Sequence, residues 1–290
     1  MNCIGYTVHL ILAVVLSTSL SSTIPSSRPV ALSAEPRSNG FVILAGDTVL
    51  RIELDGRGPV VVCNLPPTRG GLTGLDITVG LVSANIYVLL ADYEGSSAIG
   101  TCFPGKAEMG ISRLSGKGTF SSIASTGHDL VVANSRTGLL LFLDEESLKP
   151  VRQQFISGAE RISSIAYDPT QKSVVAVDGI RGNIFLISAP IQNGIISSGD
   201  VDSFLNTPVK GLQSVSVDRA HGIIYALTAD GGLARIVSKG LQQVSWNFGT
   251  RPLAFAISSD GSVISVIDDE RKLSIFDLNG GRLLFTFRLF

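Results

Sequence analysis

Four oxygen-bearing side chains recur at corresponding places along this chain of 290 residues: Asp92, Asn134, Asp178 and Asp268. Each follows an apolar run and precedes a turn and a further apolar run. Carboxylate and amide oxygens are the ligands that hard cations such as calcium prefer. The same side chains also accept hydrogen bonds from nearby backbone N–H groups and so stabilise tight turns. The pattern therefore leaves two interpretations open, a calcium or ligand site and a set of structural turns, and we favour the turns.

Other motifs that could carry chemistry fail at a defining residue. Residues 100–107 have the spacing of a phosphate-binding loop, but Ala107 has no hydroxyl for magnesium and Pro104 removes a backbone donor. The sequence contains no G-x-S-x-G, H-E-x-x-H or C-x-x-C motif. His128 and His221 fall in expected turns, where solvated residues are more common than a catalytic pair. No catalytic residue can be assigned, so we lean toward a protein that is not an enzyme.

These residues lie in a repeat that runs from about residue 40 to the C-terminus. Segments 162–188, 212–238 and 253–278 each contain an alternating apolar strand, a turn, a second strand, another turn and a third strand. The middle residues of the first strands lie 48, 42, 50 and 40 residues apart: Leu75, Ile123, Ile165, Val215 and Phe255. A unit of about 40–50 residues with four strands is typical of a propeller blade.

Residues 41–63 supply three strands of a further blade. We therefore predict an all-β fold, a six-bladed β-propeller of four-stranded antiparallel blades. The first blade lacks its innermost strand in this assignment, and the stretch from Pro29 to Ala34 is the nearest candidate to supply it. In such a ring the four oxygen-bearing residues would surround one end of the central channel.

The repeat frame, an apolar strand ending in Asp or Asn with a glycine four residues later, is clearest at Val175–Asp178 with Gly182 and at Val131–Asn134 with Gly138. This frame resembles the NHL and YVTN classes of propeller repeat, and its length is similar to WD40 repeats. The resemblance implies the fold more strongly than the function, because the propeller fold occurs in both enzymes and binding scaffolds. Gluconolactonase-like propellers hold a metal with Glu, Asn and Asp near the axis, and we find no equivalent Glu here.

The termini and charge restrict the function further. Lys and Arg number 23 against 24 Asp and Glu, which gives no basic excess for nucleic acid. Val8 to Leu16 is an apolar run broken only by His9, and small residues follow it. The run is shorter than the roughly 20 residues that span a bilayer. We predict a signal peptide at 1–23, a flexible lead-in at 24–38, the propeller at 39–290, and a secreted or periplasmic protein with no membrane span after cleavage.

Two cysteines follow the leader, Cys63 and Cys102, and they could form a disulfide in an oxidising compartment. Cys63 ends an expected outer strand, and Cys102 ends the third strand of the next blade. We expect these strand ends to lie toward opposite faces of the wheel, beyond the Cα separation of about 4.4–6.8 Å that a disulfide needs.

The sequence favours an exported, monomeric and non-catalytic binding protein that takes a protein or polysaccharide partner on one face, with no cofactor. The alternative is a metal-dependent hydrolase or lactonase of the gluconolactonase-like class, with calcium held by the four oxygen-bearing residues.

Overall fold

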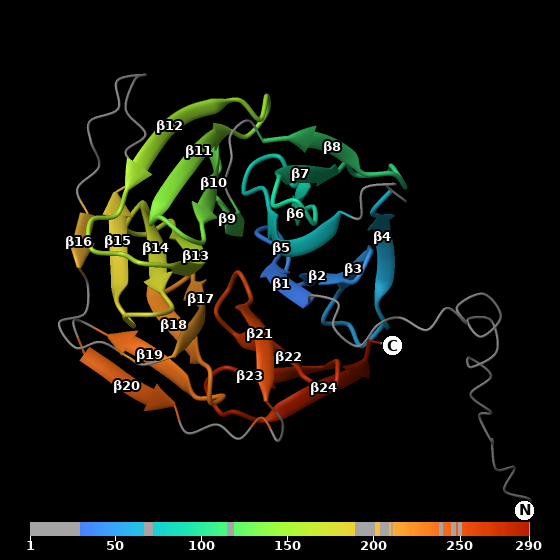
Figure 1. Cartoon of the computed structure of the whole chain (residues 1–290). Helices are drawn as coiled ribbons and strands as arrows, with labels where there is room; N and C mark the ends of the chain where they lie inside the picture. The colour runs from blue at the N-terminus through green and yellow to red at the C-terminus, as the bar shows by residue number, and fades with distance from the viewer. Residues whose placement is uncertain are drawn as a thin grey trace, which may run out of the picture.

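The computed structural model describes residues 30–66, 72–114, 119–188, 201–203, 209, 211–237, 240–244, 248 and 251–289. In this part of the chain, six four-stranded antiparallel sheets stand around a central axis (Figure 1). The predicted all-β, six-bladed propeller is confirmed. No helix among the described residues is long and apolar enough to cross a membrane.

Each blade is built from four consecutive strands, numbered outward from the axis. Blades 1 to 3 contain β1 (Val30–Ala34), β2 (Phe41–Ala45), β3 (Thr48–Ile52) and β4 (Val60–Asn64); β5 (Thr73–Val79), β6 (Ile86–Ala91), β7 (Ser97–Cys102) and β8 (Gly110–Arg113); and β9 (Phe120–Ser125), β10 (Asp129–Asn134), β11 (Leu139–Asp144) and β12 (Pro150–Phe155). Blades 4 to 6 contain β13 (Ile162–Asp168), β14 (Ser173–Asp178), β15 (Ile184–Ser188) and β16 (Val201–Ser203); β17 (Leu212–Asp218), β18 (Ile223–Thr228), β19 (Leu233–Val237) and β20 (Gly240–Val244); and β21 (Pro252–Ile257), β22 (Val263–Asp268), β23 (Lys272–Asp277) and β24 (Leu283–Arg288).

The second strand of each blade is the most apolar because both of its faces are covered by neighbouring blades. Every residue of β2, β6, β14 and β22 is buried, whereas every residue of the outer strand β8 is exposed. The described residues form six hydrophobic clusters, and each one joins two neighbouring blades. The cores of this protein therefore lie between sheets, which is why the alternating pattern becomes a continuous apolar run in these strands.

The glycine of the repeat frame has a conformational role. Gly138 and Gly182 have φ angles of 64° and 73°, in the left-handed region that residues with a Cβ avoid. In blade 6, where the glycine is missing, Arg271 takes the corresponding turn position with a φ of 60°. The left-handed residue before the third strand is thus retained when the glycine is lost, although the turn is one residue shorter.

The first blade obtains its innermost strand from the predicted stretch. β1 pairs with β2 over five residues, from Val30 opposite Ala45 to Ala34 opposite Phe41. β1 is therefore part of blade 1, although it lies before residue 39, where the sequence predicts the start of the propeller. The strand is short and follows a segment rich in Ser and Pro, so its composition resembled that of a linker.

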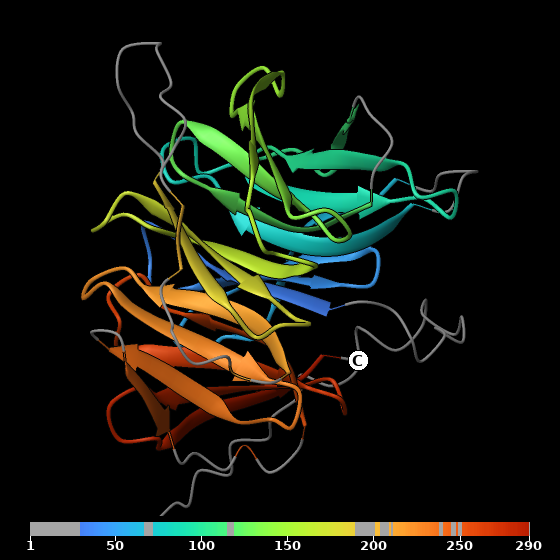
Figure 2. The same ribbon diagram turned by 60° about the vertical axis from the view of Figure 1, so that its left-hand side comes forward.

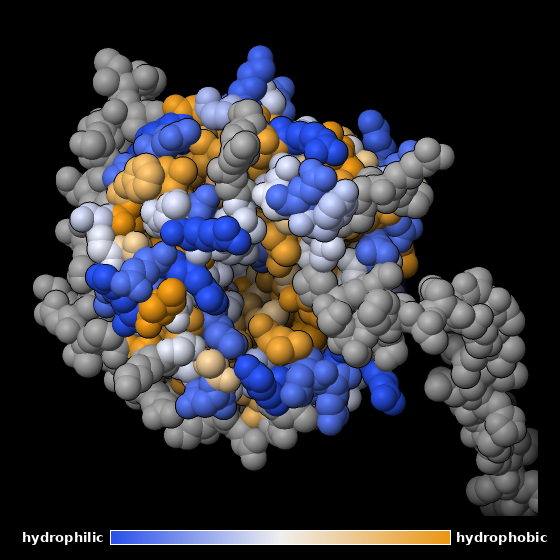
Figure 3. Space-filling model, in the orientation of Figure 1, coloured by the Kyte–Doolittle hydropathy of each residue, from blue (hydrophilic) through white to orange (hydrophobic). Residues whose placement is uncertain are grey.

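Blades 1 and 6 close the ring by packing, without exchanging a strand. Their shared cluster includes Phe41 and Ile43 from β2 and Ile275 from β23. Above it, the side-chain amide of Asn39 donates to Asp260 at 2.7 Å. The innermost strands surround the axis, and the surface is hollowed at the centre of the ring, with apolar residues on part of its wall (Figure 3).

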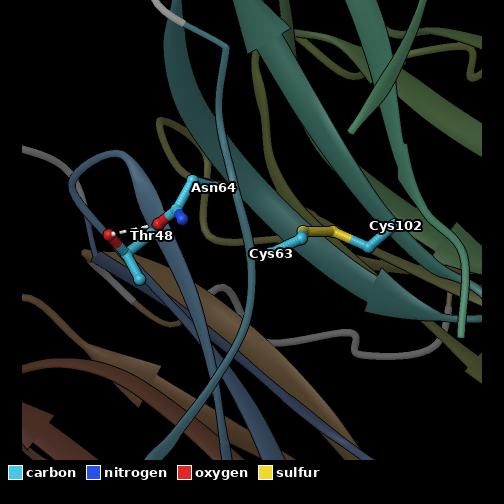
Figure 4. The surroundings of a disulfide bond; sticks show 4 residues. All are labelled: Thr48, Cys63, Asn64 and Cys102. Atoms are coloured by element: carbon cyan, nitrogen blue, oxygen red, sulfur yellow. Dashed lines mark hydrogen bonds between the residues drawn. A yellow bond between two sulfur atoms is a disulfide. The ribbon is translucent and has the colours of Figure 1, made fainter. Parts of the chain in front are cut away.

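The expected separation of the two cysteines was wrong. Cys63 on β4 and Cys102 on β7 have Cα atoms 6.2 Å apart, and the structure joins them by a disulfide (Figure 4). Sheet twist explains the difference, since each strand rotates by roughly 20–25° relative to its neighbour. The outer strands consequently run around the ring, as the turned view shows (Figure 2). The end of β4 therefore lies against the next blade, where Asn64 bridges to Glu108.

Candidate functional site

The loops of the ring lie on two opposite faces. Connections between the first and second strands of a blade, and between its third and fourth, lie on one face, here named the 1–2 face. Connections between the second and third strands, and from one blade to the next, lie on the other, here named the 2–3 face. This division follows from the antiparallel order of strands in every blade.

The four residues predicted from the repeat all lie on the 2–3 face, where each one accepts a backbone hydrogen bond in its own turn. The bonds run from Ser96 N to Asp92 Oδ1 (2.8 Å), from Arg136 N to Asn134 Oδ1 (2.9 Å), from Ile180 N to Asp178 Oδ1 (2.9 Å) and from Lys272 N to Asp268 Oδ1 (2.8 Å). Among the described residues, no three His, Cys, Asp or Glu side chains gather as a metal site. The geometry shows the turn role, and calcium binding by these residues stays a prediction.

The central channel is narrow. The innermost strands enclose about 80 Å³, which has room for a few water molecules. Two charged residues line it, Asp76 on β5 and Arg219 just after β17. Burial lowers the pKa of Arg219 to about 10, and its Nη1 atom has no hydrogen-bond partner among the described residues.

Asp76 belongs to a series of polar contacts that joins the innermost strands. Its Oδ2 accepts from Ser122 Oγ at 2.6 Å and from Ile123 N at 2.9 Å. One blade further, Ser122 Oγ accepts from Ile165 N at 3.1 Å. Asp76 and Ser122 thus play the same part in successive blades, since each side chain accepts a hydrogen bond from a backbone N–H of the next innermost strand. Asp76 is the charged one of the two. Burial is the largest influence on it and raises its pKa to about 6.

A larger space opens on the 1–2 face between blades 2 and 3. This groove has a volume of about 720 Å³. Its walls come from the loop after β5, from β6 and β8, and from the loops after β9 and β11. Three apolar side chains at the groove are exposed, Val82 by 60%, Phe103 by 38% and Ile111 by 36%. Apolar side chains exposed beside a cavity are characteristic of binding sites.

The base of the groove is a hydrogen-bonded network around Glu145. Its two carboxylate oxygens accept from Ser83 Oγ at 2.6 Å and from Ser125 Oγ at 2.7 Å. The hydroxyl of Tyr87 donates to the Glu145 backbone carbonyl at 3.2 Å, and burial raises the pKa of Tyr87. These contacts come from two blades, so they fix the position of one groove wall relative to the other.

The groove has an acidic character. Asp144, Glu145 and Glu146 line it together with His128, and no Lys or Arg is among its described lining residues. Hydrogen bonds from the side chain and backbone of Ser147 lower the pKa of Asp144 and keep it ionised. Beside the rim, Lys106 lies 5.0 Å from the centre of the Phe103 ring.

The two histidines occupy equivalent loops of different blades. His128 lies in the first loop of blade 3, on the groove. His221 lies in the first loop of blade 5, where its Nδ1 is 2.8 Å from Asp218 Oδ2. His128 lines the groove, whereas His221 lines neither the groove nor the central channel.

Solved structures with similar folds support the architecture. A chain in the crystal structure of a nidogen/laminin complex matches with a TM-score of 0.68 and 13% identity, over 85% of this chain and 92% of that one. A structural genomics protein from Bacteroides thetaiotaomicron matches with a TM-score of 0.60 and 13% identity, over 85% and 68%. A chain of the mitotic checkpoint complex matches with a TM-score of 0.58 and 13% identity, over 91% and 98%. Likeness at this identity shows the fold alone.

Comparison of sequences is less informative. No family model matches the chain. No curated protein matches it either.

Replacing Asp76 with Asn should change how stability depends on pH. The pKa of this carboxyl is about 6 in the fold against 3.8 in the unfolded chain, so the folded state binds a proton first as pH falls. The contribution of this carboxyl to the free energy of unfolding should therefore rise by about 2 kcal/mol between pH 7 and pH 4. In Asp76→Asn that contribution disappears, as denaturant titrations across this pH range would show.

The exposed Asp269 provides the control. An Asp269→Asn variant should retain the pH dependence of the parent. If Asp76→Asn retained it as well, the assignment of this titration to Asp76 would be wrong.

Proposed function

We propose that this protein is a non-catalytic binding propeller, and that the groove between blades 2 and 3 takes a segment of a protein partner. The observation that carries the proposal is the groove itself, which combines exposed apolar side chains with an acidic wall. Its volume of about 720 Å³ falls within the common range of binding sites. A segment with apolar and basic side chains complements it.

The architecture suits this role. The groove walls are loops held by packed blades, and Glu145 links them through Ser83 and Ser125. A site held in this way loses little conformational freedom when a partner binds. Two of the chains with similar folds come from structures of protein complexes, the nidogen/laminin complex and the mitotic checkpoint complex. These likenesses support a protein partner in preference to a polysaccharide.

Selection of peptides on the full chain tests the proposal. Peptides from a random library should be enriched in Lys or Arg next to apolar residues, with Kd values of about micromolar. An Ile111→Lys variant should weaken them at least tenfold, because it replaces an apolar contact with a charge that repels the basic segment. Binding measured by fluorescence anisotropy should also weaken as salt is added.

Val151 offers a matched control. It is an exposed apolar residue on the outer strand β12, 47% exposed, and it is not among the described residues that line the groove. Val151→Lys should leave peptide affinity unchanged. Equal losses in the two variants would refute the groove assignment. A chain that binds neutral oligosaccharides and no selected peptide would refute the protein partner.

We also propose that the protein is exported. The apolar leader supports this, although residues 1–29 lie outside the described part of the chain. The bridge between Cys63 and Cys102 supports it too, because disulfides persist mainly in oxidising compartments.

Peptide mapping of the protein purified from its source tests both the removal of the leader and the disulfide, provided that free thiols are alkylated and no reductant is added. It should give a crosslinked peptide pair that contains Cys63 and Cys102, and an N-terminus near residue 23. A mature chain that begins at Met1 with both cysteines alkylated would contradict export.

A further inference from the structure

A second cavity opens on the face opposite the groove. It lies on the 2–3 face between blades 3, 4 and 5 and has a volume of about 600 Å³. The first residues of β9, β13 and β17 line it, together with the turns after β10 and β14. We name this space the arginine cavity because Arg136 and Arg161 are part of its wall.

β-Bulges supply polar residues to this cavity. The innermost strands of blades 3, 4 and 5 each leave one residue unpaired in the ladder: Ser121, Ser163 and Gln213. All three line the arginine cavity. The corresponding bulges of blades 2 and 6 hold Leu75 and Leu253 instead. Bulges often redirect side chains toward binding sites, and here the bulge residue is polar only in the three blades that surround the cavity.

The serine hydroxyls are oriented by the backbone. Ser121 Oγ donates to the carbonyl of Ile162 at 2.7 Å, and Ser135 Oγ donates to the carbonyl of Thr119 at 2.9 Å. Each hydroxyl proton is therefore used, while the oxygen lone pairs can still accept a hydrogen bond. Such oxygens complement a ligand that carries hydroxyl groups.

The two arginines give the cavity its positive charge. Both side chains are exposed, and neither forms an ion pair with a described residue. No Asp or Glu is among the described residues that line the cavity. Nearby, Glu160 is engaged with Arg181, whose Nε lies 2.8 Å from its carboxylate. A guanidinium presents paired N–H donors that match a carboxylate.

We propose that the arginine cavity binds a small organic acid that also carries hydroxyl groups. Its carboxylates would contact Arg136 and Arg161, and its hydroxyls would contact the serines and Gln213. This site lies on the opposite face from the proposed protein-binding groove, has the opposite charge and does not depend on it.

Isothermal titration of the full chain with citrate tests the proposal, since citrate has three carboxylates and one hydroxyl. Citrate should saturate one site per chain. Arg136→Gln and Arg161→Gln should each weaken it at least tenfold, the loss expected for one charge-assisted contact. Propane-1,2,3-tricarboxylate, which lacks the hydroxyl, should bind several-fold more weakly. Replacing exposed side chains has little effect on folding, which thermal melts of the variants would verify.

Arg181→Gln is the matched control, because it removes an arginine from the same face that is already paired with Glu160. It should leave citrate affinity within about twofold, as should Ile111→Lys in the groove. The proposal is overturned if citrate gives no saturable heat at about 10 mM, or if Arg181→Gln weakens it as much as Arg161→Gln. Sulfate that binds as tightly as citrate would overturn the organic-acid assignment and indicate a site for simple anions.

Discussion

The structure depends on one constraint, which is that no blade can bury both faces of its own sheet. In every described blade the second strand is predominantly apolar, so it must be covered by the blade on each side. A closed ring is the arrangement that satisfies all six blades together. Closure here relies on β1, which completes blade 1 and contacts β21 of blade 6. Without this strand, the shared cluster of blades 1 and 6 would lose part of its cover.

The two larger cavities lie at the faces of the ring, where the packing between neighbouring blades ends. The interior of each junction between blades is apolar, and its loops lie on the two faces. A cavity at a junction therefore combines residues from different blades. On the 1–2 face the junction of blades 2 and 3 presents an acidic, partly apolar groove. On the 2–3 face the junctions around blade 4 present hydroxyls and arginines. The same scaffold thus presents two cavities whose described lining residues carry opposite charge.

Sequence predicted the scaffold better than the sites. The period of the repeat identifies six blades because the apolar strands and left-handed turn glycines are local features. The repeated Asp and Asn residues were also placed correctly at the turns. The groove could not be found in this way, since Ser83 and Glu145 are 62 residues apart and meet only through packing. The cysteines were misjudged because strand order alone omits the twist that brings β4 to the next blade. The sequence does contain a signal for Asp76. It is a carboxylate in an innermost strand, and the innermost strand of the next blade has a serine that contacts it.

Hydrogen–deuterium exchange of the full chain, measured at β1, tests the closed ring most directly. The β1 amides that bond to β2 should exchange as slowly as those of β13, the innermost strand of blade 4, which lies far from the junction of blades 1 and 6. Both strands can open only when packing between blades is lost. Exchange of residues 30–34 at the rate of exposed turns, with β13 still protected, would contradict closure by this strand and with it the account of how the blades are held together.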